Sequence, residues 1–405
     1  MKIVEAREYY GLHRGEKEAM PAKIIADRYQ VDYVVLVPNL PAKEDRATGT
    51  VKGRRLKGEK ALEEVAGGSK YYRVRLLPAF EWRTSWMPTV FFEIIKERPD
   101  LLVCSPGYTF SLKDYAFMAA KKLLNVPLVF LDAGDEIFAQ TFFKRILSPV
   151  EKIWVRKCVD LVITYSELGQ ARLRRVYGLP LQAIKVIPKG INLNRFSPSL
   201  DGRPFLKEHG IPAGFTALYV SRLDKPKGPH VFLEAAKKCR ELGLSKLNFV
   251  LVGDGEMRAE LEEYCRENSL DNVYFTGMLP NRKIAAAYAA ADVFVMPYTK
   301  DLFAAGFGTV VAEAMAMGKP IIIGLKGYEK STPLKHMENA ILTSPGNTEE
   351  IAEAIASLYN DGKLRERLGQ SARACAQKNM DWEAQADVYY ELYLNLLCNG
   401  KKGRL

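Results

Sequence analysis

The 405-residue sequence is poor in the residue types that bind metals or form disulfides. It contains four histidines and six cysteines, none of the histidines stands at the spacing of metal ligands, and no Cys-x-x-Cys pair occurs. The sequence therefore carries no recognisable zinc site or redox motif. Widely separated cysteines of this kind are typical of reduced thiols in a cytoplasm.

Long apolar runs are also missing. No stretch approaches the roughly 18 apolar residues of a membrane-spanning helix, and the opening run Met1–Val4 is too short for a signal peptide. The composition, 48% hydrophobic and 26% charged, is that of an ordinary globular protein and excludes a disordered chain, collagen and a small disulfide scaffold. We expect a cytoplasmic protein of two domains, with peripheral contact at the inner face of a membrane as a further hypothesis.

Acidic residues are in short supply in the first half only. The net charge is +11, and residues 1–200, with 33 basic and 22 acidic side chains, account for all of it. Such asymmetry favours an anionic partner for this half: a membrane surface, a phosphorylated small molecule or a nucleic acid. A basic, solvated face that only aids solubility is equally compatible with the count.

Short apolar runs alternate with helical patterns along most of the chain. Continuous apolar strands that alternate with helices predict parallel sheets covered by helices on both faces. The predicted strands are 34–37, 101–103, 128–131, 161–163, 217–220, 249–252, 273–275, 293–296 and 320–323.

The pattern restarts after a segment rich in proline and glycine, Ser197–Gly214, which we interpret as a linker. The fold class is thus α/β, with two doubly wound domains. We place an N-terminal domain at residues 1–196 and a C-terminal domain at 205–381.

Two strand-to-helix turns of the second half carry unusual residues. Ligands of open parallel sheets bind at the carboxyl ends of the strands. After the strand that ends at Val220, Arg222 and Lys227 are placed to converge on a diphosphate, although a solvated turn with incidental charges also fits. After Val252, Gly253 allows close approach of the backbone to a ligand, but glycine suits any tight turn.

A third turn is more specific. Gly306-Phe307-Gly308-Thr309 opens a helix, so that free backbone N–H groups are expected to face an anion such as phosphate. Glu313 follows Thr309 by about one helical turn, where a carboxylate can accept hydrogen bonds from vicinal hydroxyls such as those of a ribose.

Together these turns resemble the donor-binding half of the retaining nucleotide-sugar glycosyltransferases of glycosyltransferase family 4 (glycosyl transferases group 1), which have the GT-B fold. Three further segments are similar to that family: Val186–Asn192 with Phe196, Ala291–Pro297, and Asn339–Leu342 with the turn Pro345–Asn347. The similarity is nearly continuous from about Asp160 to Leu368. It implies two Rossmann-like domains that face each other across a cleft, with a last helix, here 382–405, that crosses back to the N-terminal domain.

The resemblance also implies residue roles. Arg222 and Lys227 would bind the donor diphosphate and stabilise the leaving nucleotide. Glu313 would hold the ribose hydroxyls. The remaining donor contacts would come from Gly253, from the loop Gly277, Met278 and Leu279 beside the base, and from Ala305, Gly306, Phe307, Gly308 and Thr309 at phosphate and sugar. The donor would be a nucleoside diphosphate sugar, and neither a metal nor a resident cofactor is expected, in keeping with the absence of an Asp-x-Asp motif.

Two positions depart from the family pattern near the transferred sugar. Ala305 stands where the family has the first of two glutamates, eight positions before Glu313. Ala133 stands where many members have a histidine, and Asp132 or Asp135 is the candidate to supply a polar contact there. A solvated acidic turn explains these aspartates equally well, and of the two we take Asp132 as the candidate catalytic residue.

Two functions remain open at this point. The first is a retaining glycosyltransferase whose acceptor is a sugar, a lipid-linked molecule or another anionic molecule. The alternative is a nucleotide-sugar-binding partner or regulatory subunit with impaired catalysis. We favour the enzyme because the diphosphate-binding pair is intact. Nucleic acid is not expected as a partner, since the basic residues form no recognisable module and lack interleaved aromatics. The clusters Lys152, Arg156, Lys157 and Arg172, Arg174, Arg175 favour an anionic acceptor or lipid headgroups.

Overall fold

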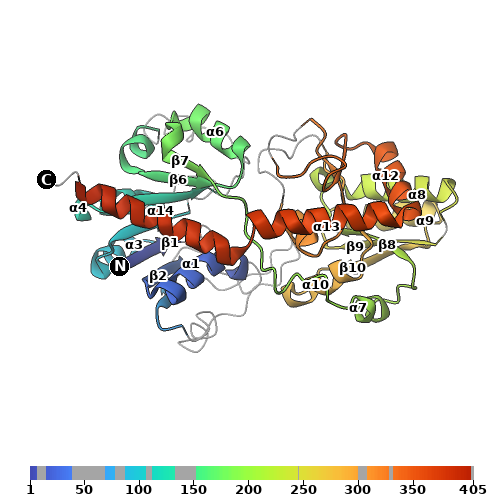
Figure 1. The fold of residues 1–405 in the computed structure, drawn as a ribbon, viewed down its shortest axis with the longest axis horizontal. Coiled ribbons are helices and arrows are strands. Elements are labelled where there is room, and N and C mark those ends of the chain that lie inside the picture. The colour runs from blue at the N-terminus through green and yellow to red at the C-terminus, as the bar shows by residue number, and fades with distance from the viewer. Residues whose placement is uncertain are drawn as a thin grey trace.

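The computed structural model describes residues 1–6, 15–38, 69–77, 87–105, 112–132, 152–244, 246–299, 308–327 and 332–402. In this part of the chain two parallel sheets form, one from each half of the sequence, and helices cover both (Figure 1). The α/β class and the two doubly wound sheets that the sequence predicts are confirmed.

The N-terminal sheet has the order β3-β2-β1-β4-β5-β6-β7 among the described strands, all parallel. Its order reverses between β1 and β4, and ligands of open α/β sheets bind beside such a switch point, at the carboxyl ends of the strands. The strands are β1 (Lys2–Ala6), β2 (Asp32–Pro38), β3 (Tyr72–Leu77), β4 (Leu101–Cys104), β5 (Leu128–Asp132), β6 (Leu161–Thr164) and β7 (Ile184–Val186).

Helices flank this sheet on both faces. They are α1 (Gly15–Tyr29), α3 (Val90–Glu97), α4 (Leu112–Leu124), α6 (Glu167–Tyr177), a helical stretch at 152–158 and the 3-10 turn η1 (Leu181–Ala183). Helix α6 has both end signals in its sequence. Ser166 accepts a hydrogen bond from the backbone N–H of Gly169 at 3.1 Å, and Gly178, in the left-handed region at φ 62°, ends the helix.

The C-terminal sheet has the order β10-β9-β8-β11-β12-β13 among the described strands, and its switch point lies between β8 and β11. The strands are β8 (Phe215–Val220), β9 (Leu247–Val252), β10 (Val273–Gly277), β11 (Val293–Met296), β12 (Ile321–Gly324) and β13 (Ile341–Thr343). The helical elements are α7 (Arg203–Glu208), η2 (Lys225–Lys227), α8 (Pro229–Glu241), α9 (Arg258–Glu267), α10 (Asn281–Ala289), α11 (Thr309–Ala316), α12 (Thr348–Asn360) and α13 (Gly362–Asn379).

The last helix, α14 (Trp382–Lys402), packs on the N-terminal half. Its Trp382, Ala386 and Tyr393 belong to the apolar core on one face of the N-terminal sheet. Tyr390 stacks on Tyr29 of α1, with 3.7 Å between ring centroids. In Figure 1, α13 and α14, both red, follow each other from the C-terminal half to the N-terminal half.

The chain passes between the two halves twice, and hydrogen bonds join the two passages. The backbone N–H of Ile191 donates to the carbonyl of Met380 at 2.7 Å, and the Gln385 side chain donates to the carbonyl of Pro188 at 2.7 Å. Gly190 lies so close to Trp382 that a Cβ there would be 2.1 Å from its indole Cδ1. The interdomain segment and the start of α14 therefore form one packed unit.

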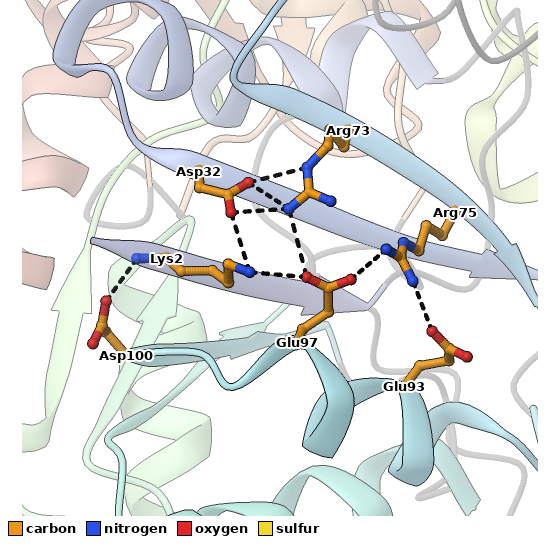
Figure 2. A network of polar contacts seen from close by, with 7 residues as sticks. All are labelled: Lys2, Asp32, Arg73, Arg75, Glu93, Glu97 and Asp100. Atoms are coloured by element: carbon orange, nitrogen blue, oxygen red, sulfur yellow. Dashed lines mark hydrogen bonds and ion pairs between the residues drawn. The ribbon is translucent and has the colours of Figure 1, made fainter.

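A network of charged side chains joins β1, β2, β3 and α3 (Figure 2). Glu97, almost fully buried, accepts from Lys2 at 3.1 Å and from Arg75 at 2.6 Å, and Asp32 accepts from Arg73 at 2.6 Å. Lys2 and Asp32 are the first residues of their strands. The network thus lies at the amino ends of the strands, opposite the edge where ligands bind, and its role is to hold the sheet and α3 together.

Candidate donor-binding site

The turn after β8 brings the two predicted diphosphate ligands, Arg222 and Lys227, to the carboxyl edge of the C-terminal sheet. Lys227 ends the 3-10 turn η2, and its ammonium lies 5.2 Å above the ring of Tyr298. Gly228 follows at φ 71°, and a Cβ there would be 1.9 Å from the carbonyl oxygen of Pro297. Only glycine fits this position, so the turn is held against the chain that leaves β11.

An acidic residue lies between the two cations. Asp224 Oδ2 is 2.6 Å from Arg222 Nη2, and Arg222 is half exposed. The other oxygen of this carboxylate, Oδ1, is buried and accepts no hydrogen bond from the described residues. Arg222 is therefore already matched with an anion, in the place where a diphosphate is predicted to bind. Asp224 is not among the site residues predicted from the sequence, although its position two residues after Arg222 was a signal.

The turn after β9 lies directly beside the turn after β8. Gly253 has φ 142°, and a Cβ on it would be 1.9 Å from the carbonyl oxygen of Ser221. Its N–H donates to the carbonyl of Gly277 at 2.9 Å, which joins it to the end of β10. Met278 follows with 41% of its surface exposed, and Leu279 packs partly on the core. The structure thus places Gly253, Gly277 and the two residues after it at one edge.

The third turn is described from Gly308 onward, at the start of α11. Gly308 precedes Thr309, the first residue of the helix, and its backbone forms a hydrogen bond with the phenol of Tyr298. Burial raises the pKa of Tyr298 to about 12, and the bond from Gly308 works against that rise. Tyr298 thus connects the start of α11 with Lys227, a link that the sequence analysis did not predict. The predicted sites Ala305, Gly306 and Phe307 lie outside the described residues.

Glu313 lies one turn into α11 and is fully buried. The phenol oxygen of Tyr288, in α10, lies 2.9 Å from Glu313 Oε2 and 3.0 Å from the carbonyl oxygen of Val310, and its single proton is shared between these two acceptors. Burial and the neighbouring Glu313 charge raise the pKa of Tyr288 well above its ordinary value, so the phenol remains a donor at neutral pH. In this structure the Glu313 carboxylate is fully buried, and its contact with ribose hydroxyls stays a prediction.

On the N-terminal side, Asp132 ends β5 in a partly buried ion pair. Its two oxygens lie 2.5 and 2.6 Å from Arg172 Nη2, and Thr164 donates to it at 2.8 Å. Arg172 belongs to α6, so the pair fastens this helix to the sheet. The catalytic role of Asp132 stays a prediction, while Ala133 and Asp135 lie outside the described residues.

The Asp132–Arg172 pair removes one residue from the basic clusters that the sequence predicts. Arg172 is almost fully buried and does not belong to the exposed cations, because α6 turns it toward Asp132. Arg156, Lys157, Arg174 and Arg175 are exposed. Arg156 Nε donates to the carbonyl of Tyr177, which joins the stretch 152–158 to the end of α6. One exposed basic surface therefore spans both segments.

The part of the chain that the structure describes holds neither a metal-binding cluster nor a membrane-spanning helix. Among these residues no group of three or more His, Cys, Asp or Glu side chains is arranged to hold a metal ion. Nor does any helix of the described ranges combine the length and apolarity needed to cross a membrane.

The arrangement of the two sheets agrees with that of a solved structure. HepE of Anabaena, solved in complex with UDP, superposes with a TM-score of 0.72 at 21% identity, over 98% of this chain and 100% of that one. The fold is GT-B: two Rossmann-like domains, each with a doubly wound parallel sheet.

The sequence matches two families, one in each half. Residues 26–195 match Glycosyltransferase Family 4, and residues 205–374 match Glycosyl transferases group 1. The phosphatidyl-myo-inositol mannosyltransferase of Mycobacterium leprae is 30% identical over 294 residues, 70% of this chain and 71% of that protein. The chain belongs to glycosyltransferase family 4, glycosyl transferases group 1.

Other relatives match over less of their length. The D-inositol 3-phosphate glycosyltransferase of Pseudarthrobacter chlorophenolicus is 30% identical over 238 residues, which is 57% of this chain and 55% of that protein. For three such curated relatives the matched residues span only 55% to 59% of the relative's length.

Proposed function

We propose that this chain is a retaining glycosyltransferase that moves a sugar from a nucleoside diphosphate sugar to an acceptor. One observation carries the proposal: Arg222, Lys227 and the start of α11 lie around the switch point of the C-terminal sheet. Two cations and a helix N-terminus at that edge suit a diphosphate. Membership of the family supports the same reading.

In the proposed reaction the acceptor hydroxyl attacks the anomeric carbon from the face that the diphosphate leaves. The bond between that carbon and the β-phosphate oxygen breaks, the new glycosidic bond forms, and the acceptor proton passes to the departing phosphate. Arg222, Lys227 and the α11 dipole stabilise the negative charge that develops on the diphosphate. This route needs no protein nucleophile, metal or cofactor, so Ala305 does not prevent it.

For the acceptor we propose an anionic molecule, lipid-linked or soluble, that approaches the N-terminal domain. The exposed Arg156, Lys157, Arg174 and Arg175 supply positive charge there, and basic clusters attract anionic headgroups. The names of two relatives include inositol 3-phosphate and phosphatidyl-myo-inositol, which are anionic molecules of this kind. We propose a cytoplasmic location with peripheral membrane contact.

The experiment is a thermal-shift screen with nucleoside diphosphate sugars, followed by an assay of diphosphate release with candidate acceptors. A donor that binds the native state raises the melting temperature by mass action. Binding accompanied by acceptor-dependent release supports the transferase.

A second candidate rests on Ala305, whose methyl group cannot accept the hydrogen bond that the family's glutamate accepts. This candidate is a nucleotide-sugar-binding partner or regulatory subunit. Binding of a donor without release of diphosphate, whichever acceptor is added, favours this second candidate. No binding of any donor overturns both candidates. Failure of the protein to bind anionic vesicles at low salt overturns only the proposal that the acceptor is a lipid.

A further inference from the structure

An arginine outside the predicted site lies beside the loop expected to hold the nucleobase. Arg258 is the first residue of α9, and its Nη1 atom is 3.6 Å from the position that a Cβ on Gly277 would occupy. Gly277 is in turn joined to Gly253 by a 2.9 Å hydrogen bond. The guanidinium therefore lies where the turns after β9 and β10 meet.

Two contacts fix the plane of this guanidinium. Arg258 Nε donates to Glu262 Oε1 at 2.6 Å, one turn along the same helix. The guanidinium carbon lies 5.2 Å from the ring centroid of Phe275 in β10. The side chain is 29% exposed, so it is held in place but remains accessible. A planar group stacked on an aromatic ring loses little further freedom when it binds a ligand.

The outer nitrogens of the same group are available for a ligand. Within the described residues, Nη1 and Nη2 of Arg258 donate no hydrogen bond, and the one side-chain bond uses Nε. Arg266 of the same helix differs, because its Nη2 is bonded to Glu263 and the side chain is 67% exposed. Arg258 thus presents free N–H donors at the base loop from a guanidinium that Glu262 and Phe275 hold in place.

The chemistry of the fork selects among bases. Guanine offers the acceptors O6 and N7 side by side, which arginine contacts in a bidentate manner, and uracil offers carbonyl oxygens. Adenine presents an amino group beside N7 on the corresponding edge, so a donor would face a donor. We propose that Arg258 is a specificity-determining residue that reads a carbonyl group of the nucleobase. The donor is then a uridine or guanosine diphosphate sugar, not an adenosine one; this inference rests on the proposed function.

The test is a calorimetric titration of UDP, GDP and ADP into the wild type, Arg258→Ala, Arg258→Lys and Arg266→Ala, with melting temperatures measured alongside. We expect the wild type to bind UDP or GDP more tightly than ADP. Arg258→Ala should weaken the preferred nucleotide about 10-fold to 100-fold and ADP by less than about threefold, because one base contact is lost. Arg258→Lys keeps the charge without the fork and should also lose the base preference, whereas Arg266→Ala should match the wild type.

The outcomes separate the inference from the proposed function. If the wild type binds none of the three nucleotides, the proposed function is wrong and the inference with it. If all bind but ADP is preferred, or if Arg258→Ala and Arg258→Lys keep the wild-type preference, the inference alone is wrong. An equal loss for all three nucleotides in a folded variant also overturns it, because that loss indicates a contact with the diphosphate or a structural role.

Discussion

The guanidinium of Arg222 and the carboxylate of Asp224 form an ion pair at 2.6 Å, two residues apart in the turn after β8. Asp224 thus neutralises one of the two cations predicted to bind the donor diphosphate. A diphosphate that binds Arg222 competes with this carboxylate or adds to its charge. We therefore expect the charge of Asp224 to lower the affinity of the site for anions.

The substitution Asp224→Asn removes that charge with little change in shape. We expect the affinity for a nucleoside diphosphate to rise about threefold to tenfold at low ionic strength, as a unit charge a few ångströms away near a protein surface is worth about 1 kcal/mol or more. Calorimetric titration at two salt concentrations measures it, with the exposed Glu256→Gln as control. Weaker binding by Asp224→Asn would mean that Asp224 positions Arg222 for the donor.

The bond from Tyr288 to Glu313 predicts a stability effect. Tyr288→Phe leaves a fully buried carboxylate without one of its donors, which costs about 1–3 kcal/mol of unfolding free energy. Chemical denaturation measures the loss. The matched control is Tyr359→Phe in α12, a half-buried tyrosine packed on Phe215 whose hydroxyl forms no hydrogen bond in the described residues. Equal stability of the two variants would show that the Tyr288 bond contributes nothing.

The pair of Asp132 with Arg172 allows its two roles to be separated. Asp132→Ala leaves Arg172 without its partner and should cost about 3 kcal/mol of unfolding free energy. Replacing both residues, as in Asp132→Leu with Arg172→Met, should recover much of that loss. Denaturation and sugar transfer are measured on both variants. If stability recovers in the double variant while transfer stays lost, the pair has a role in transfer beyond its structural one, as the catalytic role predicted for Asp132 requires.

The network in Figure 2 predicts acid sensitivity. Burial tends to raise the pKa of Asp32, but the bonds and charges of Arg73 and Lys2 outweigh it, and the net pKa is lowered from 3.8. A lowered folded-state pKa stabilises the protein above the unfolded-state value, and that contribution is lost as the pH falls through the folded-state value. We expect Asp32→Asn to reduce the fall in unfolding free energy below about pH 4. If the unfolding free energy of Asp32→Asn depends on pH as that of the wild type does, Asp32 does not contribute to the acid sensitivity.

The sequence predicts well those strands that are buried on both faces. Each predicted strand coincides with one in the structure. Apart from the half-buried edge strand β10, these are central strands, and a continuous apolar run is what a central parallel strand requires. Strands β1, β3, β7 and β13 are not among the predicted strands. Strand β1 contains Glu5, which is fully buried because Tyr33 donates to it at 2.7 Å. Edge strand β3 carries Arg73 and Arg75 among its apolar residues, and these pair with carboxylates distant in sequence.

In the candidate site, too, some features can be predicted from the sequence and others cannot. Arg222, Lys227 and the glycines follow from local spacing after a strand, and the structure places those it describes at one edge. The contacts that shape the site join residues far apart in the chain: Lys227 with Tyr298, Glu313 with Tyr288, and Gly277 with Arg258. Each depends on how helices and turns pack, which spacing within one turn does not reveal.

Sugar transfer by Lys227→Ala tests the central claim most directly. The assay measures nucleoside diphosphate released from the donor that gives the largest thermal shift, for the wild type, Lys227→Ala and the control Lys225→Ala, an exposed lysine of the same 3-10 turn. We predict a loss of about 100-fold or more for Lys227→Ala, since one charge that stabilises the transition state is removed, and less than about a twofold change for Lys225→Ala. Turnover by Lys227→Ala equal to that of the wild type would contradict the account.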